Sequence, residues 1–201
     1  MDQIKISFSE SEAAELKKFV TDGRSYADRV SIALTMQLLG MKGSSAELPY
    51  ILAAMDAVEG IRSGSRSKGA KRLQRPLNDF WHKHFFAPRR HLLKNLGAEY
   101  GLDNEGNQRL DRLIHEVAKE FGDQPGVWQG VLAHRLGVEG FHNRSRRIAL
   151  TGDWIVFGKH SGQNYYLALA THEEGRGQPA VALLERLKCN CGWEFPFLFP
   201  K

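Results

Sequence analysis

The first sixty residues carry apolar side chains every three or four positions, the period of an α-helix. Ser9 and Glu12 open the first stretch with the spacing of a capping box, in which the serine oxygen accepts from free backbone N–H groups. Ser25 and Ser44 are placed to begin the next two stretches, and glycines separate them. The pattern predicts three helices, over about 10–22, 26–39 and 46–59.

The middle of the chain predicts a linker followed by more helices. Residues 62–74 are polar and glycine-rich, as is typical of a loop that does not pack. Residues 77–86 alternate poorly for a strand, so we expect a short helix bearing Phe80, Trp81, Phe85 and Phe86. Further helices are expected from Pro88, which suits a first helical turn, to Gly97, over 110–121, and over 127–136.

The pattern changes after residue 147, where β-branched and aromatic runs predict strands. A three-stranded meander is expected over 148–150, 154–157 and 165–169, then a helix over about 179–188. The aromatic tail, 193–199, contains Pro196 and is expected to pack as an edge strand or apron. The fold class is therefore α+β. A mostly helical region, 1–137, and a β-rich region, 138–201, form either two lobes or one continuous domain.

The composition limits the classes of protein to which this chain can belong. The chain has 201 residues, 42% of them hydrophobic and 25% charged, which is typical of a globular protein. No run approaches the roughly 20 apolar residues that cross a bilayer, and residues 1–5 do not resemble a signal peptide. We therefore expect a cytoplasmic protein that does not bind membranes. Cys189 and Cys191 are too close for a useful disulfide and are expected to be reduced thiols. No cofactor motif is present, so none is expected.

Positive charge is concentrated in one segment. The net charge is +5, yet residues 60–95 contain ten Lys or Arg and a single acid, Asp79. A regional excess of this kind indicates a surface that faces a polyanion such as RNA. The candidate nucleic-acid-binding residues are Arg66, Lys68, Lys71, Arg72, Arg75, His82, His84, Arg89, Arg90 and Lys94.

Residues 81–95 combine histidines, cations and aromatic side chains. Arginine binds phosphate with two parallel hydrogen bonds, and aromatic faces stack on unpaired bases. An ordinary amphipathic helix with a solvated basic face is an equally good interpretation. Zinc binding through His82 and His84 is a further alternative. On a helix, however, side chains two residues apart point to different sides, so no metal site is expected.

The hairpin of the meander carries a second candidate site. Chain reversal can bring Lys159, His160 and Tyr165 together at its tip, and His172 ends the last strand. A general base, a cation and a tyrosine hydroxyl on a rigid sheet would suffice for metal-free RNA cleavage. A polar turn with aromatic cross-strand pairs is the plainer alternative.

The same stretch resembles the C-terminal meander of the RelE/ParE-type toxins, a group within the small ribonuclease folds that include barnase and the EndoU nucleases. Residues 146–157 read RRIALTGDWIVF, and residues 164–172 read NYYLALATH. This matches the basic strand, Gly-Asp-aromatic turn, and apolar strand ending near histidine of that group. The resemblance implies that Arg146 or Arg147 binds phosphate and that His172 matches the histidine ending the last strand.

Two functions follow from these features. The first is a ribonuclease-like toxin or effector, in which His160 or His172 acts as general base or acid, Arg146 stabilises the phosphorane, and Tyr165 assists. Arg89, Arg90 and Lys94 would then hold the RNA backbone. The second is a non-catalytic antitoxin, immunity protein or accessory factor. It would bind nucleic acid through the basic segment, or a protein through the aromatic tail.

Overall fold

The computed structural model describes residues 8–42, 47–61, 69–101, 107–124, 126–147 and 152–199. The protein is α+β, as the sequence predicts. The chain folds into two compact units. Among the described residues, unit 1 comprises those within 1–63, 69–85 and 153–201, and unit 2 comprises those within 86–152. Unit 2 therefore interrupts unit 1 in sequence, and this division differs from the break expected after residue 137.

Unit 1 is built around an antiparallel sheet in the order β1-β2-β3-β4. Ser161 and Gly162 both have positive φ, 48° and 76°, which suits the tight turn that joins the last two strands. The predicted second and third strands of the meander are confirmed as β3 and β4, whereas residues 148–150 lie outside the described part of the chain. The strands are Lys71–Arg72 (β1), Phe80–His84 (β2), Trp154–His160 (β3) and Gln163–Ala170 (β4).

The short helix predicted over residues 77–86 is wrong, because Phe80–His84 forms β2. Phe80 pairs with Gly158 and His84 pairs with Trp154 of β3. Helices cover both faces of this sheet, so aromatic and polar residues are buried on either side of β2. The strand therefore lacks the apolar–polar alternation of a half-exposed strand.

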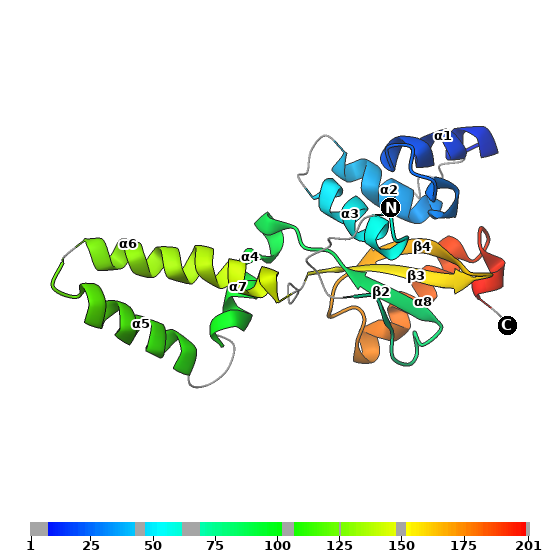
Figure 1. Ribbon diagram of the computed structural model, residues 1–201. Coiled ribbons are helices and arrows are strands. Elements are labelled where there is room, and N and C mark those ends of the chain that lie inside the picture. Colours follow the sequence, from blue (N-terminus) through cyan, green and yellow to red (C-terminus); the bar gives the residue numbers. More distant parts are fainter. Residues whose placement is uncertain are drawn as a thin grey trace, which may run out of the picture. The chain divides into compact units, whose positions relative to one another are not determined.

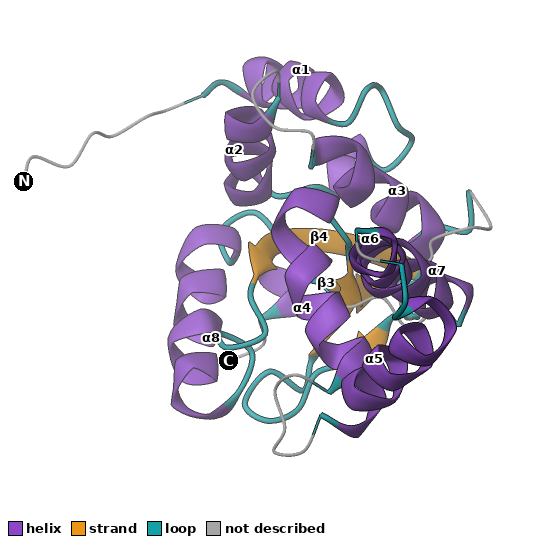
Figure 2. Ribbon diagram, turned by 90° about the vertical axis from the view of Figure 1, so that its left-hand side faces the viewer, coloured by secondary structure: helices purple, strands orange, loops and turns teal. Residues whose placement is uncertain are grey.

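Helices pack on both faces of the sheet, giving unit 1 three layers (Figures 1 and 2). On one face, the buried Tyr166 of β4 donates to the carbonyl of Met55. On the other face, Leu183 and Leu187 join Val156 and Leu167 in one apolar cluster. The helices of the first face are Glu10–Val20 (α1), Ile32–Met41 (α2) and Leu48–Val58 (α3), and the helix of the second face is Gly177–Cys191 (α8).

Local signals placed some helix ends correctly. The capping box of Ser9 and Glu12 is present at the start of α1, and α8 covers the helix predicted over 179–188. Ser25 does not begin the second helix. A 3₁₀ turn, Ala27–Arg29, follows it, and Ser31 caps α2 by accepting from the Leu34 N–H at 3.0 Å. The proposed cap Ser44 lies outside the described residues.

The C-terminal tail packs as an apron and forms no strand over its described residues. Pro196–Leu198 is a 3₁₀ helix, in which Leu198 is buried. Phe195 is also buried, whereas Trp193 and Phe197 are exposed. Cys189 and Cys191 are free thiols, as expected. Burial raises the pKa of the Cys191 thiol to about 11.

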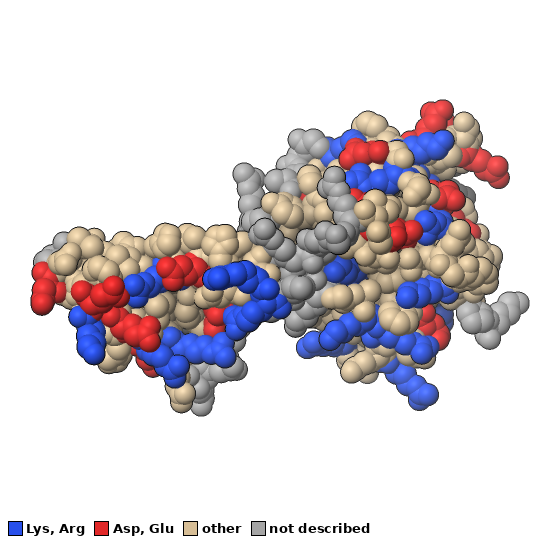
Figure 3. Space-filling view, in the orientation of Figure 1, with Lys and Arg blue, Asp and Glu red and all other residues tan. Residues whose placement is uncertain are grey.

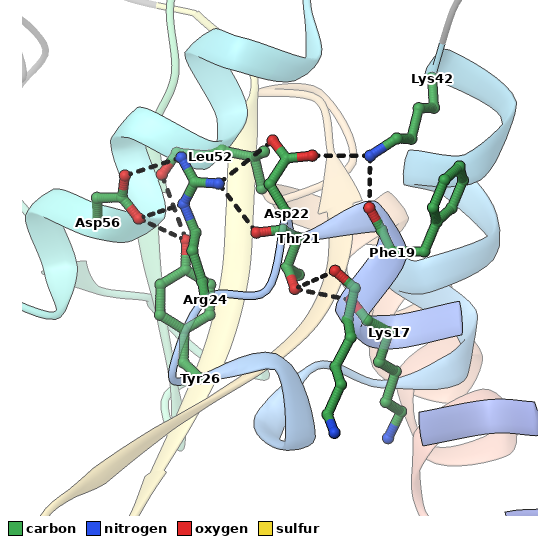
Figure 4. A network of polar contacts seen from close by, with 10 residues as sticks. Lys17, Phe19, Thr21, Asp22, Arg24, Tyr26, Lys42, Leu52 and Asp56 are labelled. Atoms are coloured by element: carbon green, nitrogen blue, oxygen red, sulfur yellow. Dashed lines mark hydrogen bonds and ion pairs between the residues drawn. The ribbon is translucent and has the colours of Figure 1, made fainter. Parts of the chain in front are cut away.

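A polar network joins the helices of the first face (Figure 4). Asp56 is 3% exposed and accepts from Tyr26 Oη at 2.7 Å. Arg24 adds two bonds to the same carboxylate, at 2.7 and 3.2 Å. At the margin of the network, Lys42 pairs with the exposed carboxylate of Asp22 at 2.8 Å. Asp56 is thus the acceptor that ties α3 to the segment between α1 and α2.

Unit 2 is a set of packed helices. The π-helical stretch Arg135–Glu139 contains Gly137, where the sequence predicted a helix end, so the helix instead continues from α6 to α7. Tyr100 donates to the Arg135 carbonyl at 2.9 Å, and Gly140 leaves room for its ring, since a Cβ there would lie 2.7 Å from it. The helices are Pro88–Tyr100 (α4), Gln108–Phe121 (α5), Val127–His134 (α6) and Gly140–Arg146 (α7). No helix within the described ranges is long and apolar enough to cross a membrane.

Candidate functional site

Three imidazole rings gather at one end of the sheet of unit 1. His82 and His84 are two residues apart on β2, so both lie on the same sheet face, 5.1 Å apart between ring centroids. His172 follows the end of β4, and its ring lies 4.9 Å from that of His84. The Trp154 indole packs against all three rings, at 4.3 Å from His82, 6.1 Å from His84 and 4.8 Å from His172. We call these four residues the histidine cluster.

The register of the sheet explains this convergence. Trp154 begins β3 and pairs with His84 on one side and with Ala170, the last residue of β4, on the other. His172 is two residues beyond Ala170 and therefore reaches the same end of the sheet. The cluster is mostly buried, with His84 at 4% exposure, and only His172 is partly exposed. Solvent reaches the cluster at His172.

Two buried polar atoms of the cluster have no hydrogen-bond partner among the described residues, His82 Nδ1 and Trp154 Nε1. Their side chains belong to residues that are 8% and 3% exposed. Buried polar groups are nearly always paired, so each of these two atoms calls for an explanation, of which a role in a functional site is one. A Cβ on Gly175 would lie 1.7 Å from the Trp154 ring. Glycine at this position is therefore what allows the indole to lie against the histidines.

Burial lowers the pKa of His82 to about 4, and positive charge on His84, His172 and Lys71 acts in the same direction. A hydrogen bond with the Lys71 backbone opposes this change and is outweighed. His82 is consequently neutral at pH 7. In the cluster it can orient its neighbours without adding charge.

This pKa makes the stability of unit 1 sensitive to acid. Unfolded His82 binds its proton near pH 6.5, whereas the folded chain binds it only near pH 4. The free energy of unfolding should therefore decrease as the pH falls from 6.5 to about 4, with a His82 contribution of about 3 kcal/mol. This contribution is measured by urea unfolding of the wild type and of His82→Gln at both ends of this pH range. The variant should lose less stability than the wild type, and an equal loss in both would contradict the assignment. His160→Gln, an exposed histidine of the same unit, is the matched control.

At the hairpin tip, two of the three predicted site residues contact the aromatic tail. His160 packs on Phe197 of the tail, at 4.4 Å between centroids, and Tyr165 packs on the same ring at 4.9 Å. Lys159 lies over the ring of Trp81 at 4.1 Å. His160 and Tyr165, which were expected to receive a substrate, thus share one ring of the aromatic tail, whereas Lys159 contacts β2.

His160 and His172, the two candidates for the general base or acid, lie at opposite ends of the hairpin. His160 pairs with Gln163 at one end of the β3–β4 hairpin, whereas His172 follows the other end. About six residues of extended strand separate the two ends, which corresponds to about 20 Å. Only His172 of this pair belongs to the histidine cluster.

The arginines expected at the start of a strand lie on a helix or directly after it. Arg146 is the last residue of α7, and its guanidinium donates to Asn143 Oδ1 at 2.8 Å. Arg147 forms an ion pair with Glu99, which is 9% exposed. Both arginines belong to unit 2, whereas the histidine cluster belongs to unit 1. Neither arginine therefore shares a compact unit with the cluster.

The candidate nucleic-acid-binding residues are distributed over both units. Lys71, Arg72 and Arg75 are exposed at or beside β1, an edge strand of unit 1. Lys94 is exposed on α4 of unit 2. Figure 3 shows mostly Lys and Arg over the lower part of unit 1, whereas acidic and basic side chains alternate over unit 2. Arg66, Lys68 and the side chains of Arg89 and Arg90 lie outside what the structure describes.

The sequence predicted a helix for this segment, which would place the side chains of His82 and His84 on different sides. On a strand, residues at i and i+2 share a face, so the same spacing brings them together. The third histidine of that segment, His91, belongs to α4, where its Nδ1 accepts from the Ala87 N–H at 2.9 Å. Trp154 and Gly175 were missed altogether. Only the register of β3 and the loop after β4 show their role.

Within the described ranges, no group of three or more His, Cys, Asp or Glu side chains is arranged to hold a metal ion. No protein-family model, curated protein or solved structure matches this chain. The resemblance to the RelE/ParE-type toxins therefore stays a prediction made from the residues alone.

Proposed function

We propose that the protein is a ribonuclease that cleaves RNA without a metal ion, and that the histidine cluster is its active site. The observation that carries this proposal is the 4.9 Å separation between the rings of His84 and His172. An imidazole acts as a general base when it is neutral and as a general acid when it is protonated. A neutral and a protonated imidazole side by side are what general acid–base catalysis requires.

The reaction proceeds by proton transfer at two oxygens of the RNA. One ring of the pair removes the proton of the ribose 2′-hydroxyl, and O2′ then bonds to the adjacent phosphorus. The bond from phosphorus to the 5′-oxygen breaks, and the other ring protonates that oxygen. The products are a 2′,3′-cyclic phosphate and a 5′-hydroxyl. His82, being neutral, positions His84 and Trp154 without titrating near pH 7.

The exposed cations of unit 1 suit the substrate. Lys71 pairs with His82 across β1 and β2, so the edge strand lies directly beside the cluster. Lys71, Arg72 and Arg75 are all exposed there. Cations beside a cleavage site bind the phosphates on either side of the scissile bond and release counterions as they do so.

The test uses the purified full-length chain, EDTA and a labelled RNA oligonucleotide. We expect cleavage that persists in EDTA, a 2′,3′-cyclic phosphate on the product, and no cleavage where a single 2′-deoxynucleotide replaces the scissile ribose. Cleavage that EDTA abolishes, or that continues past the 2′-deoxynucleotide, would refute the proposed mechanism.

A non-catalytic nucleic-acid-binding protein is the second candidate, favoured by the exposed basic edge around β1. The same assay separates the two functions. RNA that binds with a strong salt dependence but stays intact would support this candidate and exclude the ribonuclease.

A further inference from the structure

A pocket of about 390 Å³ lies at the outer edge of β4 in unit 1. β4 is the last strand in the order of the sheet, and α2 contacts both β4 and α8 there. The lining comes from these three elements and from Trp193, which follows α8, and every lining residue is described. A pocket of about 300 to 1,000 Å³ with a few convergent polar groups is typical of a ligand site.

An exposed indole forms part of this pocket. Trp193 lines it, and this residue is 68% exposed. Its Nε1 donates to the Asn190 carbonyl at 3.1 Å, which holds the ring at the end of α8. An aromatic ring that is held in position and largely open to water is suited to stack on an unpaired nucleobase.

Two carboxamides reach the same pocket. Gln37 of α2 accepts from the Leu169 N–H at 2.9 Å through its Oε1, which leaves its amide nitrogen as the donor that a ligand can use. Asn190 of α8 is exposed and contributes the second carboxamide. A carboxamide offers a donor beside an acceptor, the pattern with which Asn and Gln bind the edges of bases.

The pocket is close to neutral in charge. Arg186 is the single charged residue among its described lining residues, and it donates to Glu174 at 2.6 Å. Ile32 and Leu187 add apolar surface. A neutral lining with apolar and hydrogen-bonding groups suits an uncharged ring such as a nucleobase better than a phosphate or a metal ion.

The pocket lies on the same sheet face as the histidine cluster. Ala168, which lines the pocket, pairs with Val156, and Val156 is two residues from Trp154. Glu174, the partner of the pocket's arginine, lies in the turn that contains His172. The four residues from Ala168 to His172 span at most about 13 Å, so a short single strand of RNA can contact both sites.

We propose that this pocket binds one unpaired base of the RNA substrate, stacked on Trp193 and hydrogen-bonded by Asn190 and Gln37. The choice of ligand rests on the proposed ribonuclease function. The pocket specifies the substrate class as single-stranded RNA, because a base within a duplex is already stacked and paired. The three side chains bind the substrate and take no part in proton transfer.

Binding of a labelled 2′-O-methyl hexanucleotide to the full-length protein, followed by fluorescence anisotropy, tests the pocket. This oligonucleotide has no free 2′-hydroxyl, so its binding is measured without cleavage. The single strand should bind at least about tenfold more tightly than its duplex or than an abasic strand of the same length and charge. An abasic strand that binds as tightly would show that phosphates alone are recognised, and a duplex that binds as tightly would also overturn the proposal.

Variants locate the bound base. Trp193→Ala should weaken binding of the hexanucleotide about tenfold, as is usual for the loss of a stacking contact. Asn190→Leu, which keeps the size of the side chain and removes the carboxamide, should weaken it about threefold. Tyr50→Ala removes a ring of 42% exposure from α3 in the same unit and is the matched control, which should bind as the wild type does. Wild-type affinity in Trp193→Ala would place the base elsewhere.

Cleavage assays distinguish a failure of this pocket from a failure of the ribonuclease proposal. Trp193→Ala should lower kcat/KM for a single-stranded RNA about tenfold, mainly through a higher KM. Cleavage with an unchanged KM in this variant would refute the pocket and leave the ribonuclease standing. Base-dependent binding that Trp193→Ala weakens, without any cleavage by the wild type, would refute the ribonuclease and support the pocket.

Discussion

His84→Ala and His172→Ala should each lower the rate of RNA cleavage by about 10²- to 10⁴-fold. Each substitution removes one of the two imidazoles that lie 4.9 Å apart, so either the 2′-hydroxyl loses its base or the leaving 5′-oxygen loses its acid. Single-turnover cleavage of a labelled oligonucleotide in EDTA measures the effect. The double variant should be no slower than about the slower single variant, because the two rings act as one pair.

His160→Ala is the matched control for these variants. Its ring lies on Phe197 at the other end of the hairpin, so its removal should change the cleavage rate less than about twofold. RNA affinity should be retained in all four variants, since the cations around β1 are untouched. Wild-type rates in both cluster variants, or a loss in the His160 control as large as theirs, would refute the assignment.

Asp56→Ala should lower the free energy of unfolding by about 3–5 kcal/mol, the range for removing one partner of a buried ion pair. The substitution leaves the Tyr26 hydroxyl and the Arg24 guanidinium without their shared acceptor. Tyr26 is fully buried, so its hydroxyl cannot form a replacement hydrogen bond with water. Urea unfolding at neutral pH measures the loss.

Asp22→Asn removes a negative charge from the margin of the same network and is the control, because Asn tolerates the positive φ of 51° at this position. Its side chain is 58% exposed, so its ion pair with Lys42 is screened by solvent and contributes at most about 1 kcal/mol. A loss for Asp56→Ala no larger than that for Asp22→Asn would show that the buried network does not stabilise the protein.

The helices were largely predictable, because their signals are local. Ser9 and Glu12 cap α1 by contacts within one turn, and α8 keeps a regular apolar spacing. Strand β2 was not predictable in this way. Trp81 and Lys83 on one face and His82 on the other are all shielded by neighbouring layers, so the alternation that reveals a strand is lost.

The histidine cluster depends on contacts that no local pattern contains. In the sequence, the residues of unit 2 lie between His84 and His172. Only the pairing of Trp154 with both β2 and β4 brings the two histidines together. Gly175 has no side chain, so a prediction based on reactive side chains could not identify it as part of the site. The signal that was available is the His-x-His spacing of His82 and His84, which is informative once the segment is assigned to a strand.

The interrupted sequence of unit 1 has a consequence for dissecting this protein. The Phe85 N–H donates to the Asp153 carbonyl at 3.1 Å, so the chain leaves and re-enters the sheet at neighbouring positions. A fragment that ends before β3 contains His82 and His84 but lacks Trp154 and His172. The complementary fragment contains Trp154 and His172 but lacks the other two. Expression of either half alone therefore separates the two pairs of rings. Replacing 86–152 by a tight reverse turn is the deletion that retains every part of the cluster.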